Sequence, residues 1–249
     1  MNPKILLITG GSRGIGAATA RLAASRGYKV CINYQRNQDA ARRLVEEIVA
    51  KGGSAFAVQA DIAEESEVLR LFECIDGEQG TLAALVNNAG MLEKQMRVED
   101  MDAARLTRIL ATNVTGSFLC AREAVKRMSI RHGGKGGAIV NLSSIASRLG
   151  APNEYVDYAA SKGAIDSFTL GLAKEVAAEG IRVNAVRPGV IDTEIHASGG
   201  EPGRVERVKD AVPMKRGGNA EEVAHAILWL LSDQASYTSG AILDVTGGR

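Results

Sequence analysis

The chain has 249 residues, of which 45% are hydrophobic and 24% charged, and its formal net charge is +1. This is the profile of a globular protein with a sizeable core, and so small a net charge gives no electrostatic footprint for nucleic acid or an anionic membrane. No apolar run approaches the ~20 residues that span a bilayer, and the N-terminus is predicted to be a first strand rather than a signal peptide.

Cysteine and histidine residues give no pattern that indicates a disulfide or a metal site. Cys31, Cys74 and Cys120 are odd in number, widely spaced and set in apolar contexts. We therefore expect buried thiols in the reducing environment of the cytoplasm. The three histidines share no metal-ligand spacing, so the sequence predicts no metal.

Short β-branched or apolar runs alternate with helical patterns from one end of the chain to the other. This alternation predicts an α/β fold, in which a doubly wound, seven-stranded parallel sheet carries helices on both faces, within one domain over residues 1–249. The expected strands are 4–9, 29–34, 55–59, 83–87, 138–142, 182–187 and 241–245, and the expected helices are 15–26, 39–51, 64–77, 102–130, 155–179 and 220–232.

The first expected strand leads directly into a glycine-rich turn, Thr9-Gly10-Gly11-Ser12-Arg13-Gly14-Ile15-Gly16, which opens the first helix. Glycines here allow a tight turn and close approach of the backbone to a pyrophosphate at the positive end of the helix. The spacing is GxxxGxG rather than the commoner GxGxxG. The turn predicts a dinucleotide site formed by Gly10, Ser12, Arg13, Gly14, Ile15 and Gly16.

The end of the second expected strand indicates which nicotinamide cofactor the site prefers. It reads Asn33-Tyr34-Gln35-Arg36, without the carboxylate that holds a ribose 2′-hydroxyl in NAD enzymes. Arg13 and Arg36 could instead flank a 2′-phosphate, because a guanidinium fork suits phosphate oxygens. The alternative is two solvated arginines. The sequence favours NADP(H), with NAD(H) as the other option.

Polar or small residues also follow the third and fourth expected strands. Asp61 and Ile62 lie just past the third strand, and Asn88-Ala89-Gly90 follows the fourth. Because ligands bind at the carboxyl edge of such sheets, we expect these residues to contact the cofactor.

Tyr158 and Lys162 are four residues apart on an expected helix, so they share one face. A free tyrosine titrates near ~10, and a neighbouring ammonium favours the phenolate. The pair therefore predicts a general acid/base at neutral pH. Taken alone, a Tyr-Lys pair is common on helix surfaces, and the motif depends on its surroundings.

With these motifs in order, the whole chain resembles the short-chain dehydrogenase/reductase (SDR) family, and most closely its glucose-dehydrogenase-like and 3-oxoacyl-carrier-protein-reductase-like members. The resemblance implies a Rossmann fold and a catalytic set of Asn113, Ser144, Tyr158 and Lys162. It also implies that Pro188, Gly189 and Thr193 approach the nicotinamide. Ser143 is the alternative to Ser144, because the two are adjacent after the strand 138–142.

The activity that the resemblance implies is hydride transfer between a nicotinamide and a carbonyl or secondary alcohol. Ser144 would position the substrate oxygen and Tyr158 would give or take the proton. Lys162 would lower the pKa of Tyr158 and bind the nicotinamide ribose, and Asn113 would hold a water that links Lys162 to solvent. Family members commonly form tetramers, and we expect a homotetramer.

Three functions stay open at this point. The first is reduction of a small ketone, aldehyde or sugar-like substrate, and the second is reduction of a 3-oxoacyl thioester. The third is NADP(H) sensing by a binding protein without chemistry, since a fold does not settle function. The four catalytic residues argue against a sensor, which has no use for a matched proton donor.

Three segments are expected to close the substrate pocket: 91–97, 147–155 and the irregular, Gly/Pro-rich stretch 193–219, which we expect to be a lid. His196 in this lid is expected to face solvent. A basic stretch could dock an acidic carrier protein, although a solvated helix face is commoner. It consists of Arg122, Lys126, Arg127, Arg131 and Lys135.

Overall fold

Seven parallel strands form one sheet in the order β3-β2-β1-β4-β5-β6-β7 in the computed structural model, which describes residues 2–249. The order reverses between β1 and β4, the switch point at which doubly wound sheets bind ligands. The seven-stranded doubly wound fold is confirmed. Its strands are β1 Lys4–Ile8, β2 Lys29–Tyr34, β3 Ser54–Gln59, β4 Thr81–Asn87, β5 Gly137–Leu142, β6 Ile181–Pro188 and β7 Ile242–Val245.

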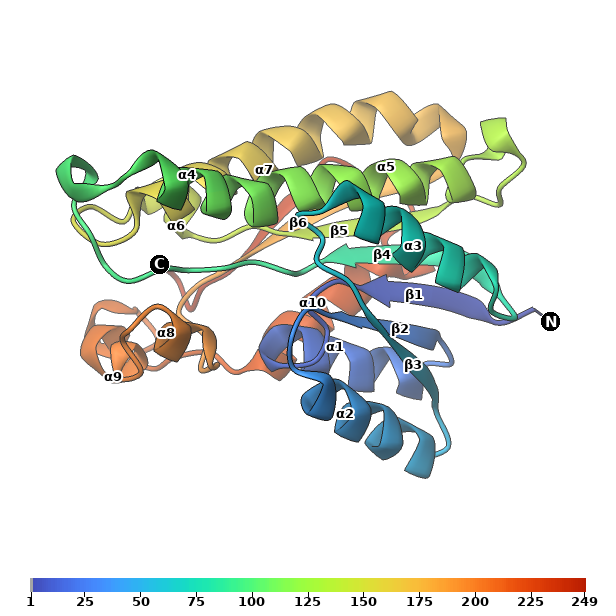
Figure 1. Cartoon of the computed structure of the whole chain (residues 1–249), viewed down its shortest axis with the longest axis horizontal. Coiled ribbons are helices and arrows are strands. Elements are labelled where there is room, and N and C mark those ends of the chain that lie inside the picture. Colours follow the sequence, from blue (N-terminus) through green and yellow to red (C-terminus); the bar gives the residue numbers. More distant parts are fainter. Residues whose placement is uncertain (1) are drawn as a thin grey trace.

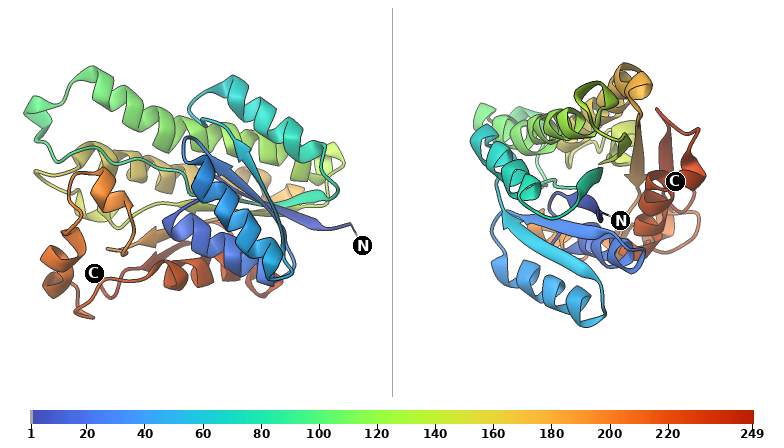
Figure 2. Two further views of the ribbon diagram at one scale, coloured as in Figure 1. Left: turned by 60° about the horizontal axis from the view of Figure 1, so that its bottom comes forward. Right: turned by 90° about the vertical axis from the view of Figure 1, so that its right-hand side faces the viewer.

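Helices cover both faces of the sheet, as Figures 1 and 2 show. The apolar residues of α1, α2 and α10 pack against one face, and those of α3, α5 and α7 pack against the other. No helix within residues 2–249 is long and apolar enough to cross a membrane. The main helices are α1 Gly14–Ser25, α2 Gln38–Ala50, α3 Glu65–Asp76, α4 Ala103–Leu110, α5 Gly116–Met128, α6 Ala146–Leu149, α7 Val156–Val176 and α10 Ala220–Leu231.

A buried chain of polar side chains ties α7 to the centre of the sheet. Asn87 on β4 donates to the Asn141 side chain on β5 at 2.9 Å. Asn141 in turn donates to the Thr169 hydroxyl on α7, also at 2.9 Å. Because buried polar groups need partners, these bonds favour one placement of α7 along the sheet.

Two expected elements differ from the structure. The single helix expected over 102–130 is two α-helices joined by one π-helical turn, Ala111–Thr115, which contains Asn113. The stretch expected to be irregular, 193–219, contains the short helices α8 Ile195–Ser198 and α9 Arg204–Val208 and a 3-10 turn Lys209–Ala211. A π turn and four- or five-residue helices carry too few periodic positions to be recognised in a sequence.

The carboxyl ends of the strands point toward α6, α8 and α9, which lie together at one end of the molecule with the C-terminus (Figure 1). The parallel arrangement thus brings the segments that follow β1, β4, β5 and β6 to a single edge. Most of the expected site residues belong to these segments or to α7. The others are Tyr34 and Arg36 at the end of β2, Asp61 and Ile62 after β3, and Asn113 in the π turn.

Candidate active site

The glycine-rich turn after β1 adopts a conformation that requires glycine. Gly10 and Gly14 have φ of +58° and +50°, in the left-handed region. A Cβ on Gly16 would lie 2.7 Å from the Gly10 carbonyl oxygen. The turn is held to the end of β4, because the Thr9 hydroxyl accepts hydrogen bonds from the backbone N–H groups of Asn88 and Ala89, both at 3.0 Å.

The N-terminus of α1 is open to an anion. No side chain caps it, and its first turn contains no acidic residue. Its free N–H groups and the positive end of the helix dipole suit a pyrophosphate.

At the far side of the turn, Gln35 donates to the Asp61 carboxylate at 2.5 Å. Arg13 and Arg36 both line the cavity, and neither forms an ion pair with another residue in the described range 2–249. Both guanidinium groups are therefore available to an anionic ligand in the cavity.

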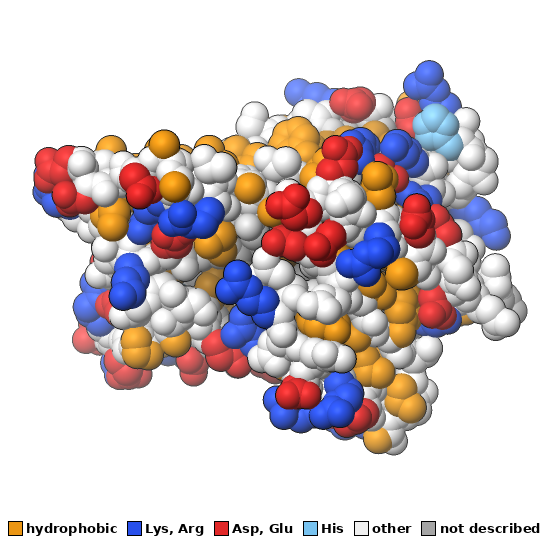
Figure 3. Space-filling model, in the orientation of Figure 1, with side chains coloured by type: hydrophobic (Ala, Val, Ile, Leu, Met, Phe, Trp, Pro, Cys, Tyr) orange, Lys and Arg blue, Asp and Glu red, His pale blue; other side chains and the backbone are white. Residues whose placement is uncertain are grey.

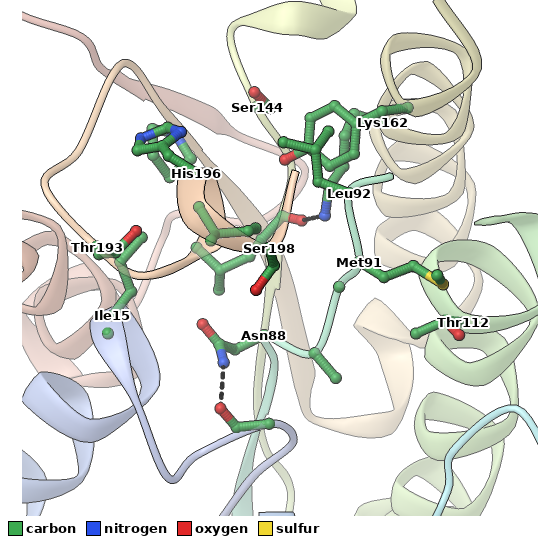
Figure 4. Close-up of a pocket in the computed structure, with 18 of the residues that line it drawn as sticks. Ile15, Asn88, Met91, Leu92, Thr112, Ser144, Lys162, Thr193, His196 and Ser198 are labelled. Carbon is green, nitrogen blue, oxygen red and sulfur yellow. Dashed lines mark hydrogen bonds between the residues drawn. The ribbon is translucent and has the colours of Figure 1, made fainter. Parts of the chain in front are cut away.

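Ser144, Tyr158 and Lys162 converge at the carboxyl end of β5. Ser144 lies in the turn after the strand, and Lys162 reaches from α7 to donate to the Leu142 carbonyl at 2.6 Å. Its Nζ lies 5.5 Å from the centroid of the Tyr158 ring. Figure 4 shows Ser144 and Lys162 on one side of the cavity, opposite Thr193 and His196 of the lid.

The structure also distinguishes the two adjacent serines. Ser143 is buried, and its hydroxyl donates to the Lys162 carbonyl at 3.2 Å. The Ser144 hydroxyl accepts from the Ala146 N–H at 3.1 Å, which leaves its own proton available. This geometry favours Ser144 as the hydroxyl that meets a substrate.

The expectation that Lys162 lowers the pKa of Tyr158 differs from what the structure indicates for these two groups. Burial raises the pKa of Tyr158 above its ordinary value, opposed by the Ser144 hydroxyl and the Arg204 charge. Burial also lowers the pKa of Lys162 to about 8, opposed by the Asp166 carboxylate. Tyr158 is therefore a protonated phenol at neutral pH, suited to donating a proton.

Asn113 lies behind the cavity wall rather than in it. Its side chain accepts from the Met91 N–H at 2.8 Å, and donates to the Met91 carbonyl at 3.1 Å and the Ser161 hydroxyl at 3.0 Å. Ser161 donates to the Tyr158 carbonyl at 2.7 Å. The Asn113 amide thus fixes the 91–97 loop to the start of α7.

Segment 193–219, the expected lid, is joined to the loop before α7 by ion pairs. Arg204 and Arg207 of α9 both contact Glu154, at 2.6 and 2.8 Å, and both also pair with Glu201. Gln95 donates to Glu201 at 2.6 Å and connects the third segment. Two arginines and two glutamates make the network neutral, so it holds the three segments together without attracting a charged ligand.

The expectation that His196 faces solvent is wrong. The half-buried ring lines the cavity, and Nε2 lies 2.9 Å from the Ile191 carbonyl oxygen. A carbonyl accepts only, so Nε2 carries the proton, and burial lowers the pKa of the ring and keeps it neutral.

One cavity of about 1340 Å³ joins these parts, from the Gly10 turn to the lid. It holds every expected site residue except Gly16, which packs against the turn, and Asn113. The open helix end, the free arginines and the length of the cavity fit a dinucleotide. Within residues 2–249, no group of three or more His, Cys, Asp and Glu could hold a metal ion.

Known protein families and structures that are similar to this chain agree with this geometry. A family model described as enoyl-(acyl carrier protein) reductase matches residues 10–249. The chain belongs to the short-chain dehydrogenase/reductase family. It is an oxidoreductase of this family that uses a nicotinamide cofactor, and the hydride-transfer activity implied by the sequence is confirmed at that level.

Several SDR proteins are similar over nearly their whole length. An uncharacterised oxidoreductase of Escherichia coli (strain K12) is 63% identical over 245 residues, which cover 98% of this chain and 99% of that one. A Synechocystis 3-oxoacyl-[acyl-carrier-protein] reductase is 38% identical, covering 100% and 97%. The crystal structure of a Brucella melitensis 3-ketoacyl-(acyl-carrier-protein) reductase complexed with NADH has a TM-score of 0.91 at 34% identity, covering 100% and 98%.

Two features of this SDR site were missed in the sequence. The first is the ion-pair network of Glu201, Arg204 and Arg207, which are spaced three residues apart. This spacing is typical of one helical face, but the surrounding glycines and prolines favoured an irregular segment. The second is a buried ion pair between Arg105 on α4 and Asp157, the residue before Tyr158. Its Nε–Oδ2 distance is 2.7 Å, and both side chains are at most 4% exposed.

The Arg105–Asp157 pair generates a prediction about stability. Arg105→Met leaves Asp157 buried without a countercharge, so we expect the free energy of unfolding to fall by about 3–5 kcal/mol. Arg108→Met is the matched control, because Arg108 is 54% exposed in its ion pair with Glu93. We expect it to change stability by less than about 1 kcal/mol. Equal effects of the two variants in urea denaturation would contradict this assignment.

Proposed function

We propose that this enzyme is an NADP(H)-dependent carbonyl reductase of small ketones, aldehydes or sugar-like substrates. The observation that carries the proposal is the convergence of Ser144, Tyr158 and Lys162 on a cavity that continues to the open end of α1. When bound, the nicotinamide supplies the hydride. The chain supplies the proton, the placement of the substrate oxygen and the exclusion of water.

Each residue has a role that follows from its position. The Ser144 hydroxyl donates to the substrate oxygen, and the protonated Tyr158 transfers its proton to that oxygen as negative charge develops. The buried Lys162 ammonium stabilises the resulting phenolate and binds the nicotinamide ribose. Asn113 keeps Met91 and the Tyr158 turn in register, and we retain for it a water that connects Lys162 with solvent.

The dinucleotide lies along the residues expected from the sequence. We assign the pyrophosphate to the Gly10–Gly16 turn and the adenosine to Tyr34, Arg36, Asp61 and Ile62. The remaining contacts are assigned to Asn88, Ala89, Gly90, Pro188, Gly189 and Thr193. Residues 193–219 act as the lid of a single domain.

The first prediction concerns Tyr158. We expect Tyr158→Phe to lower kcat by about 10²- to 10⁴-fold while the NADPH dissociation constant stays unchanged, because the hydroxyl acts only in proton transfer. NADPH oxidation is measured with small diketones, aldehydes, sugar-derived ketones and an acetoacetyl thioester. Wild-type turnover in the variant would refute the role of Tyr158.

The second prediction concerns cofactor preference. Arg13 and Arg36 lack carboxylate partners and flank the expected 2′-phosphate, so we expect Arg36→Ala to raise KM for NADPH by about 10- to 100-fold and leave KM for NADH nearly unchanged. Arg42→Ala is the control, since Arg42 is exposed on α2 and pairs with Asp39. Equal losses with both cofactors would argue against a 2′-phosphate site.

A 3-oxoacyl thioester is the second candidate substrate, favoured by the names of the Synechocystis and Brucella relatives. The basic stretch at the end of α5 and in the loop after it has few cations left to bind an acidic carrier protein. Figure 3 shows Lys and Arg interspersed with Asp and Glu on this face. Four of the five cations pair with carboxylates: Arg122 with Glu65, Lys126 with Glu123, Arg127 with Asp76, and Arg131 with Glu179. The acetoacetyl thioester in the panel decides between the candidates.

A sensor that binds NADP(H) without chemistry remains the alternative of another class. The proton donor, its serine partner and the buried lysine argue against it, since binding alone needs none of them. Tight NADPH binding without turnover of any panel member would favour the sensor.

Two further proposals concern assembly and compartment. The expectation of buried thiols is wrong for Cys74, which is exposed, whereas Cys31 and Cys120 are buried. We propose a homotetramer in the cytoplasm, supported by these three free thiols, by the open edge of β7, and by apolar side chains exposed on α4, α5 and α7. These are Leu106, Leu110, Phe118 and Leu170, each at least 40% exposed. Sedimentation velocity should show a tetramer, and a monomer at micromolar concentration would contradict the proposal.

A further inference from the structure

A line of alternating charges leads from the surface to the helix that carries Lys162. Arg148 of α6 pairs with Asp244 of β7 at 2.8 Å, and Asp244 lies 3.5 Å from Arg187 of β6. Arg187 then pairs with Asp166 of α7 at 2.9 Å. Asp166 is one helical turn beyond Lys162, so the line ends on the helix that carries the buried ammonium.

The Asp166 carboxylate is only partly used by Arg187. Its Oδ2 accepts both hydrogen bonds, from Nε at 3.1 Å and from Nη2 at 2.9 Å. Its Oδ1 is enclosed and has no hydrogen-bond partner among the described residues. Side chains on a helix lean toward its N-terminus, so Asp166 leans over the turn that holds Lys162. A buried oxygen without a partner calls for an explanation.

Lys162 needs a countercharge that its other neighbours do not supply. It is 3% exposed, and its ammonium donates to the neutral Leu142 carbonyl. The Gly90 and Asn113 groups on its other side are neutral, and the Tyr158 phenol is protonated. Among the ionisable groups of residues 2–249, Asp166 is the one whose charge favours the ammonium. Without it, burial would favour the neutral amine.

We propose that Asp166 is a positioning residue that keeps the Lys162 ammonium charged, and that Arg187 holds its carboxylate in place. The inference rests on the proposed function, because it assigns Lys162 a contact with the cofactor. Arg187 bonds only Oδ2 of Asp166, and Oδ1 has no hydrogen-bond partner among the described residues. Arg187 also directly precedes Pro188, and the same pair ties the nicotinamide segment to α7.

The experiment measures the NADPH dissociation constant by fluorescence between about pH 6 and about pH 10, for wild type and Asp166→Asn. A charged lysine binds the ribose more strongly than a neutral one, so affinity should fall as pH rises through the pKa of Lys162. Removing Asp166 lowers that pKa. We expect the fall in affinity to begin about one pH unit lower in Asp166→Asn, and Asp166→Glu to restore the wild-type profile.

Asp244→Asn is the matched control. It removes a carboxylate from the same line, but one that contacts Arg187 rather than the Lys162 turn, and we expect the wild-type pH profile. If Asp166→Asn does not fold, Asp166→Ser provides the same comparison with a smaller side chain. A profile unchanged in the Asn or Ser variant, or a wild-type affinity that does not fall with pH, would overturn the proposal.

The outcomes distinguish a failure of the Asp166 proposal from a failure of the proposed reductase activity. A wild-type enzyme that reduces carbonyls but shows no Asp166-dependent shift refutes only the role of Asp166. An enzyme that binds NADPH with the expected shift but reduces no carbonyl supports the role of Asp166 and refutes the reductase. A purely structural role would lower the melting temperature of Asp166→Asn and leave its pH profile in place, which would also overturn the proposal.

Discussion

The contact between α7 and the carboxyl end of β5 positions most of the active site. Lys162 bonds the last carbonyl of β5, and Ser143 bonds back to the Lys162 carbonyl. Deeper in the core, Asn141 bonds Thr169. These bonds hold one helix against one strand, so the serine that follows the strand and the tyrosine one turn before the lysine face the same cavity. A shift of α7 by one residue would break all three bonds at once.

The same contact sets the electrostatics of the site. Burial of Lys162 against a neutral carbonyl disfavours its charged form and lowers its pKa. Burial of Tyr158 disfavours the phenolate and raises its pKa, so the phenol stays protonated. The site therefore combines a protonated phenol with a lysine whose pKa is lowered to about 8.

Most of the fold could be predicted from the residues. The seven strands are near their expected positions because parallel strands buried on both faces are continuous apolar runs bounded by turns. The glycine turn was also recognisable, since Gly10 and Gly14 occupy backbone conformations that other residues rarely adopt. The π turn at Asn113 and the helices of the lid were not, because both depend on contacts with distant segments: Asn113 with Met91, and α9 with Glu154.

The order and spacing of motifs along the chain indicated the family, the cofactor class and the catalytic set, because the chemistry needs these residue types at strand ends and on one helix face. The protonation states of the site residues could not be predicted from the motifs. The pKa values of Tyr158 and Lys162 depend on burial and on the charges of Arg204 and Asp166. Asp166 lies four residues beyond Lys162 on the same helix, whereas only the packing of segment 193–219 brings the Arg204 charge to Tyr158. The orientation of His196 depends equally on its bond to the Ile191 carbonyl. Folding creates the low-dielectric surroundings in which these groups act, and no local pattern of residues encodes them.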